Sequence, residues 1–257
     1  MDFLSMFAAL WFVIPLLIIG VVIKSPRFKG WVGELMVKVA IKWQLDQTQY
    51  QLINNVTLPT DNGTTQIDHI IVSVFGVFVV ETKNMKGWIY GSEKQKTWTQ
   101  KIYQYSSQFQ NPLHQNYKHV KTLQALLGLR DDQVYSVVVF VGNSTFKTKM
   151  PEHVTHGAGL IRYIKSKHQP VFTQNDIKQI SQNIQQGRLT PSMKTNREHV
   201  KHVQQIVAEK TRVDVETPAC PTCGGLMVRR ESKKGANVGK AFWGCQKFPK
   251  CRGVSNL

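Results

Sequence analysis

The chain has 257 residues with 33 basic and 16 acidic side chains, a net charge of +17 and four cysteines. This length holds one medium-sized domain and a small module, which excludes a large multidomain enzyme. So large a basic excess, with a pI near 9.8, disfavours a chain without a specific partner and indicates a polyanion, either nucleic acid or anionic lipid headgroups.

The first predicted element is an apolar helix at the N-terminus. The segment from Phe3 to Ile23 carries no charged residue. At about 1.5 Å rise per residue, it is long enough to cross a hydrocarbon core of about 30 Å. A cleavable signal peptide is the alternative, but Asp2 replaces the expected basic region and no small-residue cleavage site follows. We therefore predict a single-pass membrane anchor over residues 1–24.

Basic residues directly after this segment predict its orientation. Lys24, Arg27 and Lys29 follow the apolar run within a few residues. The positive-inside rule places such a flank in the cytoplasm. We therefore expect a single-pass membrane protein whose remaining domains lie in the cytoplasm, at a bacterial inner membrane.

A helix, a strand and a hairpin are predicted next. Gln51 to Leu58 has the composition of a strand. Ile70 to Val80 is almost entirely β-branched or aromatic, apart from Phe75-Gly76, which indicates two strands around a two-residue turn. Gly33 to Leu45 is a predicted helix with Glu34 in its first turn. Its apolar residues at helical spacing are Leu35, Met36, Val39 and Trp43.

An acidic pair and a lysine stand beside this hairpin. Because side chains alternate along a strand, Glu81 and Lys83 point to one face, and a two-residue turn adds Asp68 to that face. Carboxylates suit Mg²⁺ or Mn²⁺, which polarises a phosphoryl oxygen and activates water, while a lysine stabilises transition-state charge. The pattern indicates metal-dependent phosphodiester chemistry. A surface ion cluster explains the spacing equally well.

A further helix is predicted from Asn111, a favourable N-cap, with Pro112 at its first position and Gly128 at its end. Gln115 and His119 lie four residues apart on a different face from the apolar one. Both side chains could reach the acidic pair or simply be solvated, and we expect the former for Gln115 more than for His119. The face predicted to be buried consists of Leu113, Tyr117, Val120, Leu123 and Leu127.

The remaining elements complete an α/β domain. Tyr135 to Val141 is a nearly continuous apolar run, which is typical of a buried central strand. Thr173 to Gln186 is predicted to be a short helix. Trp98 and Tyr103 are expected to pack against the sheet. His69 alternates with its acidic neighbour and is predicted to face away from it, as a hydrogen-bonded core histidine.

These motifs together resemble the nuclease-related domain (NERD) family, which is similar to the PD-(D/E)XK nucleases. The resemblance covers about Gly30 to Gly142. It implies a PD-(D/E)XK-like mixed sheet flanked by helices, which we assign to residues 30–186. The motifs that carry it, in chain order, are Gly33-Glu34, Gln66-Ile67-Asp68-His69, Glu81-Thr82-Lys83-Asn84, Lys86-Gly87, Trp98 and Asn111-Pro112-Leu113-His114-Gln115-Asn116.

The resemblance also implies roles for five residues. Asp68 and Glu81 correspond to the metal-binding acids, so they would hold Mg²⁺ or Mn²⁺. Lys83 corresponds to the catalytic lysine. Glu34 matches an acid that the superfamily often carries on its first helix, and Gln115 matches a glutamine of the following helix in some branches.

All four cysteines lie near the C-terminus in a C-x2-C-x21-C-x5-C pattern, which suits a tetrahedral Zn²⁺ site. Two disulfides are the alternative, but thiols stay reduced in a cytoplasm. A segment of about 40 residues also has too small a core to fold without a metal. We predict a zinc ribbon over residues 218–257, after a linker with a possible helix over residues 187–217. The predicted zinc ligands are Cys220, Cys223, Cys245 and Cys251.

The cysteine-rich segment resembles the zinc-ribbon repeats at the C-terminus of bacterial type I topoisomerases, which are similar to single-strand DNA binders. The match runs from Pro218 to Val254. The chain is not a complete topoisomerase, because nothing matches the acidic metal-binding domain or the strand-passage gate. Aromatic stacking and phosphate contacts are the implied modes of binding; aromatic packing in the ribbon core is the alternative. The implied nucleic-acid contacts are Arg229, Arg230, Trp243, Lys247, Phe248, Lys250 and Arg252.

The sequence therefore predicts a membrane-anchored, Mg²⁺-dependent nuclease whose zinc ribbon holds single-stranded DNA. A non-catalytic, DNA-binding membrane tether is the alternative. In a third interpretation, the basic surface binds anionic lipid.

Overall fold

The computed structural model describes residues 17–60, 63–190, 218–232 and 241–256. The chain divides into two compact units, residues 1–191 and residues 192–257. The first unit carries the acidic pair and the second carries the four cysteines.

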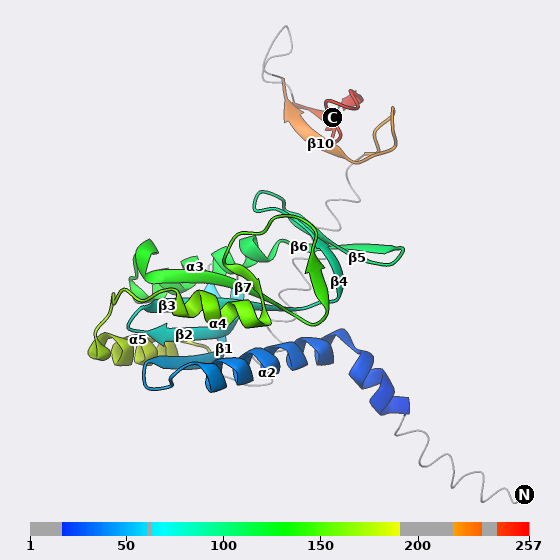
Figure 1. The fold of residues 1–257 in the computed structure, drawn as a ribbon. Coiled ribbons are helices and arrows are strands. Elements are labelled where there is room, and N and C mark those ends of the chain that lie inside the picture. The colour runs from blue at the N-terminus through cyan, green and yellow to red at the C-terminus, as the bar shows by residue number, and fades with distance from the viewer. Residues whose placement is uncertain (1–16, 61–62, 191–217, 233–240, 257) are drawn as a thin grey trace, which may run out of the picture. The chain divides into compact units, whose positions relative to one another are not determined.

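The first unit is built on two sheets (Figure 1). The larger sheet has the strand order β1-β2-β3-β7-β9, with β1, β2 and β3 antiparallel and with β3, β7 and β9 parallel. The smaller has the order β6-β5-β4-β8. The elements are α2 (Pro26–Gln44), β1 (Tyr50–Thr60), β2 (Gly63–Ser73), β3 (Gly76–Asn84), β4 (Gly87–Tyr90), β5 (Thr97–Ile102), β6 (Tyr105–Gln110), α3 (Pro112–Leu127), η1 (Asp131–Gln133), β7 (Val134–Val141), β8 (Ser144–Phe146), β9 (Val154–His156), α4 (Gly157–Lys165) and α5 (Gln174–Gly187).

Helices cover both faces of the larger sheet, as the α/β prediction requires. One apolar cluster joins α2 and α4 to one face of the sheet, and another joins α3 and α5 to the opposite face. Val137 and Phe140 on β7 are fully buried, which confirms the predicted central strand. Burial on both sides explains why the sequence of β7 lacks polar alternation.

The first helix begins earlier than predicted. Ser25 accepts a hydrogen bond from the Phe28 amide and Pro26 follows it, so the helix starts there and Glu34 lies in its third turn, not its first. A Cβ on Gly33 would lie 2.7 Å from the Asn84 Cβ, so glycine lets α2 approach the end of β3. The apolar residues that predicted this helix are exposed, and its buried face consists of Gly33, Val37 and Ile41.

The hairpin turn lies one residue earlier than predicted, which shifts the pairing of the two strands by two residues. Ser73 pairs with Gly76, so the two-residue turn is Val74-Phe75 instead of Phe75-Gly76. His69 pairs with Val80, and the next pair along this register places Asp68 opposite Glu81. The predicted single face survives, because a shift that keeps two residues in the loop preserves the alternation.

The helix α3 has the predicted ends. Asn111 caps it by accepting from the Leu113 amide, and Gly128 ends it in the left-handed conformation. Asn116 is buried and donates to the carbonyls of Val79 and Val137, so an amide takes the position that faces the sheet. Tyr117, the next residue, is turned outward and exposed, which makes its predicted burial wrong.

Of the two aromatic residues predicted to pack against the sheet, Trp98 does so and Tyr103 does not. Trp98 is fully buried and stacks with Phe140 at a centroid distance of 6.2 Å, as predicted. Tyr103 is exposed, because it lies in the turn between β5 and β6 with φ of 51°. A side chain at the tip of a two-stranded hairpin has no sheet face to cover it.

The predicted N-terminal anchor falls mainly on residues 1–16, which lie outside the described part of the chain. Residues 17–24 are helical, and the large apolar side chains from Leu17 to Ile23 are exposed. Among the described residues, no helix is long and apolar enough to cross a membrane.

The second unit contains a three-stranded antiparallel sheet of β10 (Met227–Glu231), β11 (Ala241–Cys245) and β12 (Val254–Asn256). Its apolar centre is small: Met227 is buried with two of the cysteines, and Trp243 packs against them. The predicted helix in the linker falls within residues 191–217, which lie outside the described residues.

Replacing Asn116 with leucine should lower the free energy of unfolding by about 1–3 kcal/mol, because buried carbonyls of the central strands lose their donor. Urea denaturation followed by circular dichroism measures the change. Lys118→Leu, on the exposed side of the same helix, is the control and should change stability by less than about 0.5 kcal/mol. Equal stability of the two variants would contradict the role assigned to Asn116.

Candidate functional site

The predicted acidic pair and lysine lie together just beyond the last pair of β2 and β3, His69 with Val80. Lys83 Nζ donates to Glu81 Oε1 at 2.6 Å and to Gln115 Oε1 at 2.9 Å. The Thr82 amide donates to Asp68 Oδ2 at 2.8 Å. The structure therefore brings together Asp68, Glu81, Lys83 and Gln115 from two strands and a helix.

Glu34 of α2 adds a third carboxylate. Its pKa is raised by partial burial and by the negative charge of Glu81. Burial, together with the charges of Glu81 and Glu34, raises the pKa of Asp68 well above its ordinary value. The close approach of α2 at Gly33 explains how a helix residue can influence carboxylates on the strands. Negative charge accumulates here beyond what the lysine offsets.

His119 belongs to the site, although the sequence favoured Gln115 over it. It is buried, its Nε2 lies 3.3 Å from Glu81 Oε2, and its Nδ1 shares a hydrogen bond of 2.8 Å with Thr65 Oγ1. The signal was its spacing of four residues from Gln115, which puts both side chains on one side of α3. The helix face that was left open between solvent and site therefore faces the site.

Lys83 and His119 stabilise the ionised form of the Glu81 carboxylate. Its side chain is only 3% exposed, and burial by itself would raise its pKa. Lys83 and His119 outweigh this effect and hold the pKa of Glu81 below its ordinary value. Asp68 and Glu81, which face each other across the hairpin, thus have pKa values shifted in opposite directions.

The donor set fits a hard divalent cation. Glu81 Oε2 is buried, and although His119 Nε2 lies 3.3 Å away, the two atoms do not form a hydrogen bond and Oε2 has no other hydrogen-bond partner among the described residues. A buried acceptor without a donor, beside further carboxylates, is an arrangement that a cation would stabilise. Among the described residues, however, no third acidic or histidine side chain comes close enough to join one metal-binding group with Asp68 and Glu81. A cation at this position would therefore be held by these two carboxylates together with backbone or water oxygens.

His69 confirms the prediction that it faces away from the acids. It is buried, and its Nδ1 lies 2.7 Å from Asn54 Oδ1. Burial, assisted by the charge of Lys38, lowers its pKa to about 4, so the ring is neutral at pH 7. It has a structural role in β2.

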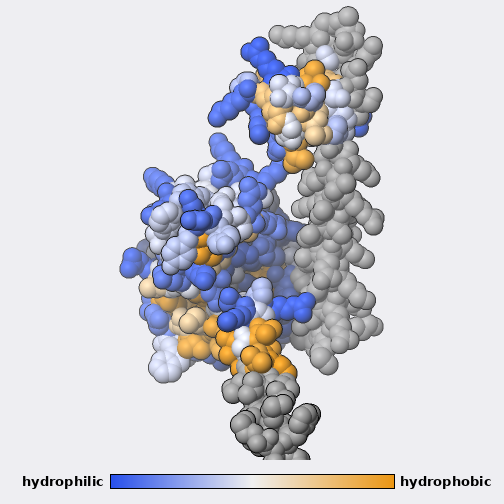
Figure 2. All heavy atoms as spheres, turned by 90° about the vertical axis from the view of Figure 1, so that its right-hand side faces the viewer, coloured by the Kyte–Doolittle hydropathy of each residue, from blue (hydrophilic) through white to orange (hydrophobic). Residues whose placement is uncertain are grey.

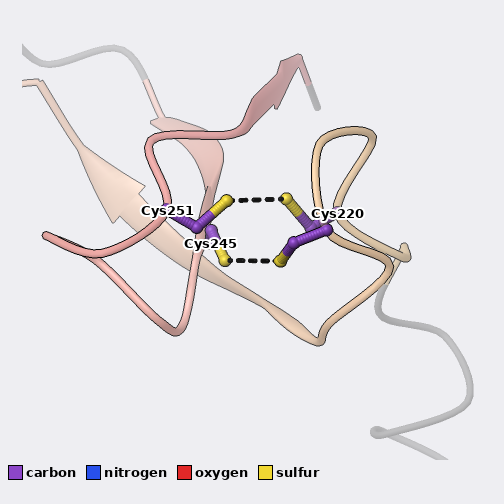
Figure 3. A group of neighbouring side chains, drawn as sticks. Cys220, Cys245 and Cys251 are labelled. Atoms are coloured by element: carbon purple, nitrogen blue, oxygen red, sulfur yellow. Dashed lines mark hydrogen bonds between the residues drawn. The ribbon is translucent and has the colours of Figure 1, made fainter.

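The four cysteines form a metal site in the second unit (Figure 3). Their Sγ atoms all lie within 4.8 Å of one another. The Cys220–Cys251 and Cys223–Cys245 pairs are separated by 3.7 and 3.6 Å. Zn–S bonds of about 2.3 Å in a tetrahedron place sulfurs about 3.8 Å apart, whereas a disulfide needs about 2.05 Å. The spacing fits a structural Zn²⁺ and excludes disulfides.

Gly253 is a further requirement of this site that the cysteine pattern did not reveal. A Cβ at this position would overlap Cys220 Sγ. The Gly253 carbonyl also accepts from the Cys245 amide at 2.9 Å, which connects two ligand loops. Its position two residues after Cys251 was the available signal.

The ribbon surface separates the predicted nucleic-acid contacts into two groups. The cations Arg229, Arg230, Lys247, Lys250 and Arg252 are all exposed. Phe248 is exposed and lies 5.5 Å beneath the Arg230 guanidinium, whereas Trp243 packs against the cysteine cluster. A hollow of about 240 Å³ is lined by Arg230, Phe242, Phe248 and Arg252. Phe248 is therefore available for stacking, and Trp243 mainly supports the fold.

Comparisons with known proteins match both units. The model of the nuclease-related domain matches residues 29–141, and that of the topoisomerase DNA binding C4 zinc finger matches residues 218–257. An uncharacterized protein of Bacillus anthracis is 37% identical over 190 residues, which cover 72% of this chain and 88% of that protein. No solved structure matches the chain. The matched ranges contain the acidic cluster and all four cysteines, which confirms both predicted resemblances.

Substituting Asp68 and Glu81 by their amides should change stability in opposite directions at pH 7 when no Mg²⁺ or Mn²⁺ is added. Folding raises the pKa of Asp68, so its stabilising contribution is lost as pH rises through that pKa; Asp68→Asn should therefore unfold at a higher temperature. Folding lowers the pKa of Glu81, so its contribution is present above the unfolded pKa and is lost on acidification. Glu81→Gln should cost about 1.5–3 kcal/mol.

Thermal and urea unfolding of both variants checks this pair of predictions. Glu152→Gln, at an exposed loop position, is the matched control and should change stability by less than about 0.5 kcal/mol. A destabilised Asp68→Asn protein would contradict the prediction that ionised Asp68 destabilises the fold when no metal is bound.

Gly253→Ala should reduce the zinc content of the purified protein, because the added methyl group overlaps the sulfur of a ligand. Gly225→Ala is the control within the ribbon, since its Cβ would meet the Cys223 Sγ at 3.4 Å, an ordinary contact. Zinc measured by elemental analysis after dialysis should be one ion per chain for the control. A full zinc content in both variants contradicts the packing described at Gly253.

Proposed function

The chain belongs to the nuclease-related domain family, and from this premise we propose that it is a metal-dependent nuclease that hydrolyses phosphodiester bonds of DNA. The observation that carries the proposal is the convergence of Asp68, Glu81, Lys83 and Gln115 where the central strands β2 and β3 stop pairing. The net charge of +17 supports a polyanionic substrate.

Asp68 and Glu81 would hold Mg²⁺ or Mn²⁺, with the Thr82 carbonyl as a further oxygen. Glu34, whose charge acts on Asp68, would help to bind the metal or its water. When bound, such an ion polarises a phosphoryl oxygen and lowers the pKa of a coordinated water. The lowered pKa of Glu81 keeps this ligand ionised at neutral pH. Asp68 needs the cation more, because burial and the neighbouring carboxylates disfavour its ionisation.

Lys83 would orient the attacking water and stabilise the charge that develops on the phosphoryl oxygens during in-line attack. Its Nζ lies between the oxygens of Glu81 and Gln115, so two acceptors direct one ammonium group. Gln115 thereby acts as a positioning residue. His119 would contribute through Glu81. Its Nε2 lies 3.3 Å from Glu81 Oε2, whereas Lys83 contacts the other carboxylate oxygen, Oε1.

A groove on the smaller sheet offers contacts for the rest of a strand. Its volume is about 430 Å³, and its lining includes Trp88 and Tyr103 together with Lys86 and Lys101. Aromatic rings stack on unpaired bases, and lysines meet phosphates. The groove begins at Lys86, three residues after the proposed catalytic lysine, which supports a substrate path from the groove toward the strand ends.

The zinc ribbon would hold single-stranded DNA. Phe248 and Arg230 provide an exposed aromatic face with a cation above it, and the surrounding arginines and lysines can contact phosphates. Shape and charge, without a base-reading helix, would make such binding tolerant of sequence.

We further propose that residues 1–24 anchor the protein in the inner membrane with both units in the cytoplasm. This part rests on the uncharged segment from Phe3 to Ile23 and on the basic flank that follows it.

A non-catalytic DNA-binding membrane tether is the second candidate. Its supporting observation is the direct ion pair of 2.6 Å between Lys83 and Glu81, which satisfies the lysine without any metal. Under this alternative, the buried charges stabilise the fold, and DNA binding depends on the ribbon and on the basic surface.

Cleavage of labelled single-stranded, double-stranded and branched DNA by the zinc-loaded full-length protein separates the two functions. Assays run with and without Mg²⁺ or Mn²⁺, with Glu81→Ala and Lys83→Ala beside the unsubstituted chain. We expect metal-dependent cleavage that each substitution lowers by about 100-fold or more. Glu152→Ala and Lys178→Ala, both at exposed positions away from the cluster, are the matched controls and should retain activity.

DNA affinity measured on the same proteins completes the experiment. Affinity that survives Glu81→Ala and Lys83→Ala, together with lost cleavage, supports catalysis at this cluster. Tight binding that needs no divalent metal, with no cleavage of any substrate by the unsubstituted chain, would instead support the tether.

A further inference from the structure

The helix α2 has an apolar face on each of two opposite sides. Its inner face, with Val37 and Ile41, is buried against the sheet. Its outer face carries Trp31, Leu35, Val39 and Trp43 at intervals of four residues, and all of them are exposed, as is Met36. Residues four apart lie above one another on a helix, so these side chains form a continuous outward stripe. We call it the outer stripe of α2.

The size of the outer stripe separates it from ordinary surface residues. Trp31 is 56% exposed and Trp43 is 87% exposed. At about 1.5 Å per residue, the stripe extends about 18 Å along the helix. Single exposed apolar residues are common on soluble proteins, whereas a contiguous row with two tryptophans marks an interaction surface.

Basic residues surround the stripe. From Lys24 to Trp43 there are five lysines and arginines and one acid, Glu34, so the segment carries a charge of +4. The single acid belongs to the carboxylate cluster and not to the outer stripe. Arg27, Lys29 and Lys42 are exposed. Tryptophan within an apolar stripe and cations beside it are typical of a helix in the headgroup region of an anionic membrane.

The chain directly before α2 continues this surface. Residues 17–24 are helical, and Leu17, Ile18 and Ile23 are among their exposed apolar side chains. Figure 2 shows hydrophobic residues gathered at the N-terminal end of the described chain, beside the residues drawn in grey. Exposed apolar side chains therefore lie both before α2 and along it, separated by a polar stretch that contains Lys24, Arg27 and Lys29.

We propose that α2 lies along the surface of an anionic membrane, with its outer stripe among the upper acyl chains and its cations among the headgroups. A second copy of the chain fits the stripe less well, because two segments of charge +4 would meet there and repel. The inference does not depend on nuclease activity. Because the inner face of α2 carries the sheet, the contact would hold the first unit in one orientation to the membrane.

Tryptophan quenching by brominated lipid tests the contact in the full-length protein. The chain is reconstituted into vesicles of phosphatidylglycerol and phosphatidylcholine with bromine on the upper acyl chain. The variants are Trp31→Phe, Trp43→Phe and the double substitution. Trp88→Phe is the matched control, since Trp88 is 46% exposed and lies on β4. Thermal unfolding verifies that each variant folds.

All proteins also carry Trp11→Phe, so that this tryptophan of the N-terminal segment gives no signal. We expect the double variant to lose most of the bromolipid quenching, with each single variant losing part and Trp88→Phe losing none. Undiminished quenching in the double variant overturns the proposal. Tryptophans shielded from both bromolipid and aqueous acrylamide would also overturn it, and chemical cross-linking would then identify a second copy as the occupant. Replacing phosphatidylglycerol by phosphatidylcholine should weaken the quenching from Trp31 and Trp43, because the flanking cations lose their partners.

Discussion

The site depends on the interaction of the buried Glu81 carboxylate with Lys83 and His119. A carboxylate that is 3% exposed stays ionised only if nearby groups compensate for the lost water, and Lys83 and His119 do so from the same strand and from α3. This compensation positions the lysine, which Gln115 also holds. Asp68 is compensated less: burial and the charges of Glu81 and Glu34 outweigh the Thr82 amide and Lys83, so its pKa is raised.

Two packing contacts position the helices α2 and α3 beside the Glu81 carboxylate. Gly33 lets α2 touch the end of β3, so Glu34 can act on the strand carboxylates. Asn116 ties α3 to the backbone of the central strands, and its neighbours along the helix, Gln115 and His119, then face Lys83 and Glu81. The second unit is stabilised differently. The apolar centre of its described residues, around Met227, is small, so metal binding by the four cysteines would supply much of its stability.

The prediction of local features succeeded wherever neighbouring residues decide the conformation. The cap at Asn111, the end of α3 at Gly128 and the shared face of Glu81 and Lys83 follow from hydrogen bonds and alternation within a few residues. The error of one residue in the hairpin turn did no harm, since the loop kept its length. Tyr117 and Tyr103 were assigned wrongly, because burial depends on what faces a side chain and not on its own hydrophobicity.

The amino-acid sequence alone was sufficient for the family, for the acidic pair with its lysine and for the zinc ligands, because each of these is a pattern of residue types at short and regular spacing. The tertiary structure alone decided that His119 joins Glu81, that Gly253 is needed beside Cys220 and that α2 keeps an apolar face outside. These features depend on which faces of the strands and helices pack against each other. Residue spacing along the sequence does not determine this packing.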